Sequence, residues 1–386
     1  MKFSEIKENV KNVALAGYVP FVRGLHGIGK SEMMESVAGE IGEALGKDVV
    51  FHAIDVAHIK EGELTGMPVT GVDKETGCTV NTYTVYNVFN EVIAEAKQGY
   101  VPVIFFDEIN RTDRVVFNEL MPIILNKRVQ ETYLPEETVI LTAGNPEDIS
   151  KYKGASDDYA VLPMDPALKD RLFMFELDVD PVEWLRWATK DDHVDSDIVE
   201  YITEYPNMLH FLSNNELNPT PRGWTMLSKV YKIIKKGKTS LDEYEDNLIT
   251  TASGKIGRDT ALNFVRFMRE NKNPLLKVAD FFGETVSDDL FNQNLAKLKN
   301  ETPTRQYVTM ANLTSYYIKQ LSTDEIKKSK PKKTALTGRF FECLMSLPND
   351  ITIGTIIDIK NESKLALTEI VKYDPKRIIG IQKYLV

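Results

Sequence analysis

One eight-residue segment, Gly24-Leu25-His26-Gly27-Ile28-Gly29-Lys30-Ser31, constrains the fold more than any other part of this 386-residue chain. It fits the pattern G-x-x-x-x-G-K-[ST] and follows an apolar stretch at 18–22 that is typical of a strand. An amphipathic helix is predicted directly after it, over about 30–45. A plain strand-to-helix turn would need none of these side chains, so the segment favours a phosphate-binding loop.

The chemistry of such a loop assigns a role to each residue type. Glycines let consecutive backbone N–H groups curl around phosphate oxygens, and the N-terminus of the next helix favours negative charge. The lysine and the hydroxyl reach the terminal phosphates and a magnesium ion. The predicted nucleotide-binding residues are Gly24, Gly27, Ile28, Gly29, Lys30 and Ser31.

Helical and strand patterns alternate over the first 180 residues, which predicts an α/β fold with a parallel sheet covered on both faces. Further strands are expected at 49–56, 103–106, 138–142 and 173–179. From about residue 180 the apolar spacing becomes helical. We expect three domains: a nucleotide-binding α/β domain at 1–180, a helical lid at 181–272 and a mostly helical C-terminal extension at 273–386.

Two carboxylates, Asp107 and Glu108, end the strand at 103–106, which is apolar at every position. Beside a triphosphate, the first would hold magnesium through water and the second would polarise the attacking water. Taken alone, the pair is also compatible with an acidic helix N-cap. Together with the phosphate loop it favours a catalytic site, with Ser31 and Asp107 at the metal.

Asn145 follows the strand at 138–142, within Gly144-Asn145-Pro146. A polar side chain there could reach the γ-phosphate or the attacking water; beside the other motifs this interpretation is favoured over an Asx-Pro turn, which stays open.

Other segments carry structural expectations. Residues 57–82 read as a long loop, which in a compact domain is usually functional or mobile. Pro122 should kink or end the helix that begins near Thr112. The lysine-rich run at 327–333 reads as a solvated loop rather than a phosphate-binding patch. Residues 351–359 are ambiguous between strand and buried helix, and the three tryptophans are expected in the core of the lid rather than on a base-stacking surface.

Five motifs in order resemble an AAA+ ATPase, and most specifically its MoxR-type branch, which is related to the dynein and McrB modules. They are the phosphate loop, FFDEINR at 105–111, TAGNPED at 142–148, DPALKDRL at 165–172 and TPRGW at 220–224. ELTGMPV at 63–69 is similar to the segment after the second strand in that branch. The resemblance covers about residues 5–270.

The resemblance implies a role for each matching position. Gly24, Gly29, Lys30 and Ser31 match Walker A, Asp107 and Glu108 match Walker B, and Asn145 matches sensor 1. Arg171 matches the arginine finger, which enters the neighbouring subunit's site, and Arg222 matches sensor 2 on the lid. The family is commonly a hexameric ring, because one subunit alone leaves charge on the γ-phosphate uncompensated. Lys169 and Arg111 are nearby basic alternatives for the finger, and an ordinary ion pair would also explain Arg171.

The expected function is therefore ATP and Mg²⁺ binding, with hydrolysis at subunit interfaces of a homo-oligomer that remodels or assembles a partner protein. The resemblance suggests a partner with a von Willebrand factor A-type domain, and the segment at 57–82, including Met67, with nearby Tyr83 is the expected substrate contact. Two alternatives stay open: a McrB-like NTP-driven nucleic-acid motor that uses the run at 327–333, with GTP as an alternative nucleotide, and a slowly hydrolysing assembly switch.

Composition narrows the classes of partner and the cellular compartment expected for this chain. The net charge of −10 works against nonspecific attraction to nucleic acid or anionic lipid. No stretch approaches the length of a membrane span, and the charged N-terminus argues against export. Two distant cysteines, Cys78 and Cys343, give neither a metal spacing nor a disulfide framework, which suits a cytoplasmic protein.

Overall fold

The computed structural model of the chain describes residues 1–72, 78–84, 86–148, 161–190, 193–213, 217–270, 274–283 and 285–378. The chain divides into two compact units. Unit 1 comprises Met1–Asp180 and His210–Arg222, and unit 2 comprises Pro181–Leu209 and Gly223–Val386.

A parallel five-stranded sheet with the order β2-β5-β8-β1-β9 forms the centre of unit 1. Its strands are β1 (Pro20–Arg23), β2 (Val49–Asp55), β5 (Val101–Asp107), β8 (Val139–Gly144) and β9 (Phe173–Glu176). All five match strands predicted from the sequence. Because parallel strands present their carboxyl ends at the same edge, this order places the end of β8 between the ends of β1 and β5.

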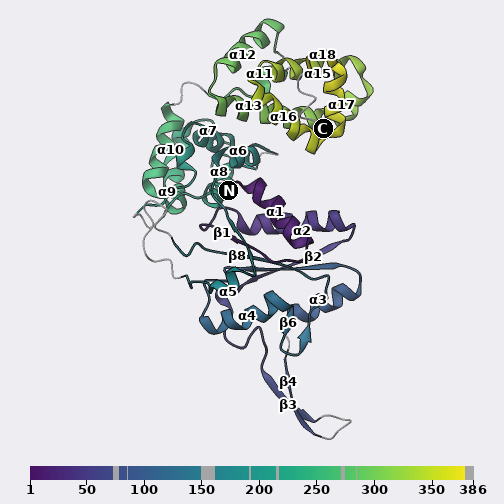
Figure 1. Cartoon of the computed structure of the whole chain (residues 1–386). Helices are drawn as coiled ribbons and strands as arrows, with labels where there is room; N and C mark the ends of the chain where they lie inside the picture. The colour runs from purple at the N-terminus through teal and green to yellow at the C-terminus, as the bar shows by residue number, and fades with distance from the viewer. Residues whose placement is uncertain are drawn as a thin grey trace. The chain divides into compact units, whose positions relative to one another are not determined.

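Helices cover both faces of the sheet (Figure 1). One face packs against α1 (Phe3–Leu15) and α2 (Lys30–Leu45), and the other packs against α3 (Asn87–Lys97) and α4 (Arg114–Asn126). Successive side chains of β5 alternate between the two cores: Val103 and Phe105 belong to the first, Ile104 and Phe106 to the second. This double burial explains why β5 is apolar from Val101 to Phe106, and it gives Asp107 and Glu108 a rigid base.

Two local expectations in unit 1 need correction. The segment read as a loop at 57–82 contains the end of a 3₁₀ turn, Val56–His58, and an antiparallel hairpin of β3 (Pro68–Val72) and β4 (Thr79–Tyr83) that projects from the body of the unit (Figure 1). Of the two outcomes expected at Pro122, an end of the helix is wrong: α4 continues to Asn126, because Ile123 and Ile124 are buried in the core, and a kink stays a prediction. A second short hairpin, β6 (Arg128–Val129) and β7 (Thr132–Tyr133), follows this helix.

The described part of unit 2 is helical. Its longer helices are α6 (Pro181–Thr189), α7 (Ser196–Glu204), α8 (Pro221–Ile234), α9 (Glu245–Ile256), α10 (Arg258–Glu270), α12 (Asp288–Asn300), α13 (Pro303–Leu321), α15 (Lys330–Met345), α16 (Asn349–Glu362) and α17 (Lys364–Tyr373). Short helices are η3 (Pro206–Met208), η4 (Leu241–Glu243), α11 (Ala279–Phe282), α14 (Asp324–Lys328) and α18 (Pro375–Ile378). Helix α8 begins in unit 1, which contains Pro221 and Arg222, and continues in unit 2.

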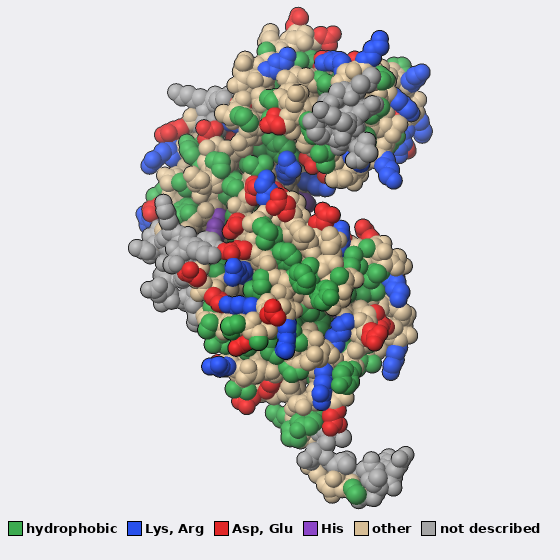
Figure 2. Space-filling view, in the orientation of Figure 1, with side chains coloured by type: hydrophobic (Ala, Val, Ile, Leu, Met, Phe, Trp, Pro, Cys, Tyr) green, Lys and Arg blue, Asp and Glu red, His purple; other side chains and the backbone are tan. Residues whose placement is uncertain are grey.

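Two segments of the C-terminal region that the sequence left ambiguous or predicted as a loop are helical. The ambiguous stretch at 351–359 lies in α16, where Ile351, Ile356 and Ile359 are buried in the core. The lysine-rich run was wrongly read as a loop: it spans the end of α14 and the start of α15, where two of its lysines pair with Glu325 and Glu369. On the face shown in Figure 2, Lys and Arg side chains gather along the outer margin of the C-terminal helices.

Polar links join the lid helices to the C-terminal helices within unit 2. The buried guanidinium of Arg305 on α13 contacts Glu301 at 2.5 Å and Glu204 of α7 at 3.6 Å. Arg186 of α6 lies 4.4 Å from the centre of the Tyr307 ring, whose hydroxyl donates to Asp358 of α16. Helices on both sides of the expected boundary at 272/273 therefore contact one another, and that boundary stays a prediction.

The predicted fold class is confirmed: a parallel α/β sheet of the P-loop NTPase type is followed by a helical C-terminal part. Among the described residues, no helix is long and apolar enough to cross a membrane.

Candidate nucleotide-binding site

The phosphate loop connects the end of β1 to the start of α2. Gly27 and Gly29 adopt positive φ angles of 71° and 97°, which L side chains rarely adopt. A Cβ atom on Gly24 would lie 2.8 Å from the Leu177 carbonyl oxygen, and one on Gly27 would lie 2.9 Å from Thr220 Oγ1. The glycines are therefore required both by the backbone turn and by close packing.

Lys30 is the first residue of α2, and its side chain is buried. Its ammonium donates to the carbonyl oxygens of Gly24 (2.7 Å) and Leu25 (2.9 Å), and it lies 3.4 Å from Asn145 Oδ1. Burial lowers the pKa of Lys30 to about 8, although Asp107 and Glu108 act in the opposite direction. The ammonium thus rests on the loop's own carbonyls, next to the position where phosphates are expected.

Ser31 and Asp107 meet across the edge of the sheet. Ser31 Oγ donates to Asp107 Oδ2 at 2.7 Å, so a hydroxyl from the first turn of α2 and a carboxylate from the end of β5 lie side by side. Oxygen donors of this kind suit Mg²⁺, which usually takes one or two protein ligands together with substrate phosphates and water. Among the described residues no group of three or more His, Cys, Asp or Glu side chains could hold a metal ion.

Glu108 occupies a strained position directly after β5, with a φ angle of 53°. Its amide N–H donates to Asp107 Oδ1 at 2.9 Å, which stabilises the turn. Its carboxylate accepts from Arg111 Nη1 at 2.9 Å. The Glu108 side chain is therefore paired with Arg111, which the sequence offered only as an alternative to Arg171 as the arginine finger.

Asn145 follows β8 and lies between the phosphate loop and the Asp107–Glu108 turn. It is 1% exposed, and its Nδ2 atom has no hydrogen-bond partner among the described residues. A buried amide donor without a partner costs about 1–3 kcal/mol. That donor lies on the same carboxamide whose oxygen faces Lys30, so a phosphate oxygen or a water molecule near Lys30 would satisfy it.

The two predicted arginines occupy different settings. Arg171 follows the short helix α5 (Pro166–Lys169), and its exposed side chain makes no ion pair within the described chain. Neighbouring Lys169, by contrast, pairs with Glu147 at 2.7 Å. The amide N–H of Arg222 donates to the Gly27 carbonyl at 3.0 Å, which ties the start of α8 to the phosphate loop.

The sequence reasoning missed three residues at this site. His26 lies in the phosphate loop, and its pKa is lowered by burial and by the charges of Lys30, Arg222 and Arg111. Burial and the neighbouring His26 lower the pKa of His210 to about 4, so the His210 ring stays neutral at pH 7. The third is Asn110, which is fully buried and bonded to Asn145. Its only sequence signal was its place two residues after Glu108.

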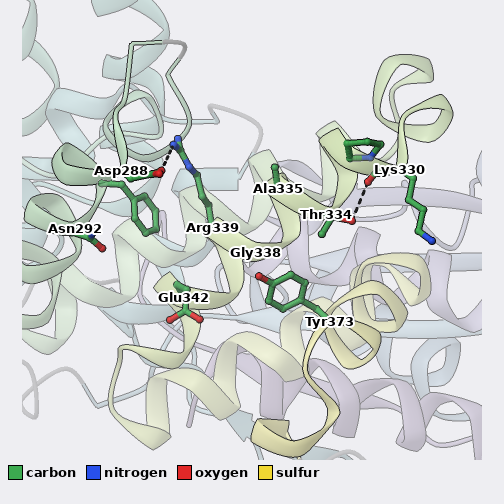
Figure 3. A pocket seen from close by; sticks show the side chains of 11 residues that line it. Asp288, Asn292, Lys330, Thr334, Ala335, Gly338, Arg339, Glu342 and Tyr373 are labelled. Atoms are coloured by element: carbon green, nitrogen blue, oxygen red, sulfur yellow. Dashed lines mark hydrogen bonds and ion pairs between the residues drawn. The ribbon is translucent and has the colours of Figure 1, made fainter.

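Apart from the phosphate loop site, a hollow of about 710 Å³ lies within unit 2 among α12, α15 and α17 (Figure 3). Arg339 on its wall donates to the carbonyl oxygens of Phe281 and Val286 and also pairs with Asp288. Glu342 pairs with Arg377. Because these charges already have partners, we assign no ligand to this hollow.

The parallel sheet, the glycine loop before α2 and the acidic end of β5 together define a P-loop nucleoside-triphosphate-binding fold.

No protein-family model matches the chain, and no curated protein matches it. Solved structures with partial similarity include a point mutant of Thermotoga maritima RuvB, with 14% identity and a TM-score of 0.34 over 77% of this chain and 78% of that one. C. elegans PCH-2 gives 13% identity and a TM-score of 0.39 over 70% of each chain. A chain of the E. coli MS115-1 HORMA:CdnC:Trip13 complex gives 12% identity and a TM-score of 0.34 over 70% of this chain and 84% of that one. Such low values carry no argument about function.

Proposed function

We propose that the chain is an AAA+ ATPase, similar in its motifs to the MoxR-type branch, that hydrolyses ATP at subunit boundaries of a ring and thereby remodels or assembles a partner protein. The observation that carries the proposal is the meeting of Lys30, the Ser31–Asp107 pair and Asn145 at the carboxyl ends of three adjacent parallel strands. Ligands bind at this edge in open α/β sheets.

Each residue then has a chemical task. With a nucleotide bound, Lys30 would exchange the loop carbonyls for phosphate oxygens, and Ser31 with Asp107 would hold Mg²⁺, which would supply charge neutralisation at the phosphates. Glu108 orients and polarises the attacking water. Asn145 donates its open Nδ2 hydrogen bond to the γ-phosphate or to that water.

The cations near the site support a finger supplied by another subunit. Arg111 is engaged by Glu108 and Lys169 by Glu147, whereas Arg171 has no ion pair within the described chain. An exposed guanidinium of this kind is available to a neighbouring copy, where it would compensate charge on the γ-phosphate. Arg222, at the start of α8, is proposed to contact the nucleotide from its own subunit.

A mixing experiment tests the shared site. Glu108→Gln and Arg171→Ala proteins should each be nearly inactive. In mixed rings, an Arg171→Ala subunit with an intact Glu108 can receive the arginine of a Glu108→Gln neighbour. An equal mixture should therefore regain about a quarter of the wild-type rate if subunits combine at random. No recovery in a mixture that forms rings, or no rise in particle mass on adding ATP and Mg²⁺, would count against the proposal.

A slowly hydrolysing assembly switch is the second candidate, and the Arg111–Glu108 pair favours it because that pair holds the proposed catalytic carboxylate. Single-turnover hydrolysis compared with Glu108→Gln separates the two: a switch would release phosphate no faster than the variant. The nucleic-acid motor would instead show salt-dependent retention on DNA, or a preference for GTP.

The proposed protein partner, for which the family resemblance suggests a von Willebrand factor A-type domain, would contact the β3–β4 hairpin. Met67 and Tyr83 at its base are 68% and 42% exposed. Exposed apolar side chains on a projecting hairpin are typical of a protein contact.

A further inference from the structure

Asn110 is a fully buried polar side chain to which the proposed chemistry gives no task. It lies two residues after Glu108, in the turn that follows β5, and is 0% exposed. Its Nδ2 donates to the Asn145 carbonyl oxygen at 2.8 Å, and its Oδ1 accepts from the Asn145 amide N–H at 2.9 Å. A buried carboxamide is thus satisfied by the two backbone groups of one residue.

This pair continues the sheet beyond its last backbone pairing. The ladder between β5 and β8 ends at Phe106 opposite Thr142, after which the Ile109 N–H donates to the Ala143 carbonyl at 3.1 Å. The Asn110 carboxamide then takes the place of a peptide group opposite Asn145. On the other side of β8, the Gly24 N–H donates to the Gly144 carbonyl at 3.2 Å. The backbone at Asn145 is therefore held from both neighbouring strand ends.

The space around the pair is filled. A Cβ atom on Gly144 would lie 2.4 Å from Asn110 Oδ1 and 2.8 Å from the Phe21 ring. Any side chain at position 144 would therefore push Asn110 away from Asn145. In addition, the Asn110 carbonyl accepts from the Leu162 N–H at 2.8 Å, so the residue is anchored on both its side-chain and its backbone atoms.

We propose that Asn110 is a positioning residue for ATP hydrolysis. By fixing the backbone of Asn145, it keeps that residue's carboxamide beside Lys30 with the Nδ2 donor open toward the γ-phosphate or the attacking water. The inference rests on the proposed function. Asn110 itself touches no reacting atom, and its effect is transmitted through Asn145.

The test is a double-mutant cycle on the full chain with ATP and Mg²⁺. Asn110→Ala should lower kcat about 10- to 100-fold, as expected when a catalytic group is misplaced by a fraction of an ångström, with little change in the Kd of a fluorescent ATP analogue. In the Asn145→Ala background the same change should alter kcat less than about twofold, because the group that Asn110 positions is already absent. Gly144→Ala, which disturbs the pair from the other side, should reproduce both results if Asn110→Ala folds poorly.

Thr142→Val is the matched control. Thr142 is equally buried on β8, and its hydroxyl donates to the Pro20 carbonyl at 2.8 Å, away from Asn145. This variant should lower the unfolding temperature to a similar degree yet keep kcat. The inference is overturned if Asn110→Ala keeps its kcat, if it loses as much kcat in the Asn145→Ala background, or if Thr142→Val loses kcat equally. A folded wild-type chain that hydrolyses no ATP would instead refute the proposed function, and the inference with it.

Discussion

The Arg111 guanidinium lies 2.9 Å from the Glu108 carboxylate, three residues earlier in the same turn. The pair ties up the one carboxylate proposed to activate water, while Asp107 is left to Ser31. Since the Arg111 side chain is about half exposed, the contact can be exchanged for another without unpacking the core.

Removing Arg111 should therefore release Glu108. We expect Arg111→Ala to raise the basal ATP turnover of the isolated chain severalfold, measured as steady-state phosphate release. Arg111→Ala combined with Glu108→Gln should stay inactive. A lower turnover in the single variant would show instead that Arg111 acts on the phosphates.

The lowered pKa of Lys30 predicts a pH dependence of ATP binding. Below pH 8 the lysine is charged with or without nucleotide, so its titration does not affect affinity. Bound phosphates raise its pKa, so above about 8 binding requires uptake of a proton, and the affinity for ATP should fall by up to about tenfold per pH unit. Titrations with a fluorescent ATP analogue from about pH 7.5 to 9.5 measure this. Lys30→Met should bind more weakly with no such fall, and an equal fall in both proteins would exclude Lys30 as the cause.

The hairpin predicts a separation of activities. Replacing Met67 and Tyr83 together by serine should abolish partner remodelling but leave basal hydrolysis within about twofold, because both side chains are exposed and neither belongs to the proposed nucleotide site. Val115, another exposed apolar residue of unit 1, is 46% exposed on α4, and Val115→Ser is the control. Equal loss of both activities in the hairpin variant would contradict the assignment.

The buried ion pair between Arg305 and Glu301 leads to a prediction about the free energy of unfolding of unit 2. Its removal leaves the poorly exposed Glu301 without its nearest cation, and breaking a buried pair from one side costs about 3–5 kcal/mol. Arg305→Ala should lower the unfolding free energy of unit 2 by an amount of this order, followed by the fluorescence of Trp224, which is buried there. Lys332→Ala, which breaks an exposed pair with Glu325, should cost less than about 1 kcal/mol. Similar losses in the two variants would show that burial of the Arg305 pair has no special effect.

The sequence could predict the phosphate loop and the acidic strand end because each is a local pattern with a local physical cause. Glycines at positive φ and an apolar strand buried on both faces can be read without knowing their neighbours. Asn110 could not be found in this way, since its role depends on β8 lying next to β5, a pairing between segments 35 residues apart. Strand order is a long-range property that apolar spacing does not contain.

Other differences between the sequence-based predictions and the structure also arise from contacts that a local pattern does not contain. Pro122 lies inside α4 because burial of Ile123 and Ile124 outweighs one lost backbone hydrogen bond. The hairpin of β3 and β4 was missed because its threonines and glycines are typical of loops, and only their cross-strand pairing makes them strands. The roles of Arg171 and Arg222 stay predictions, since both depend on a nucleotide and one on a second copy.

Helix α8 spans a boundary that proteins more often bridge with a flexible peptide. Its first two residues belong to the unit that contains the phosphate loop, and the remainder belongs to unit 2. The Arg222 N–H is bonded to the Gly27 carbonyl, so the first turn of this helix is fastened to the phosphate loop, and any shift of the loop would move the start of α8 with it.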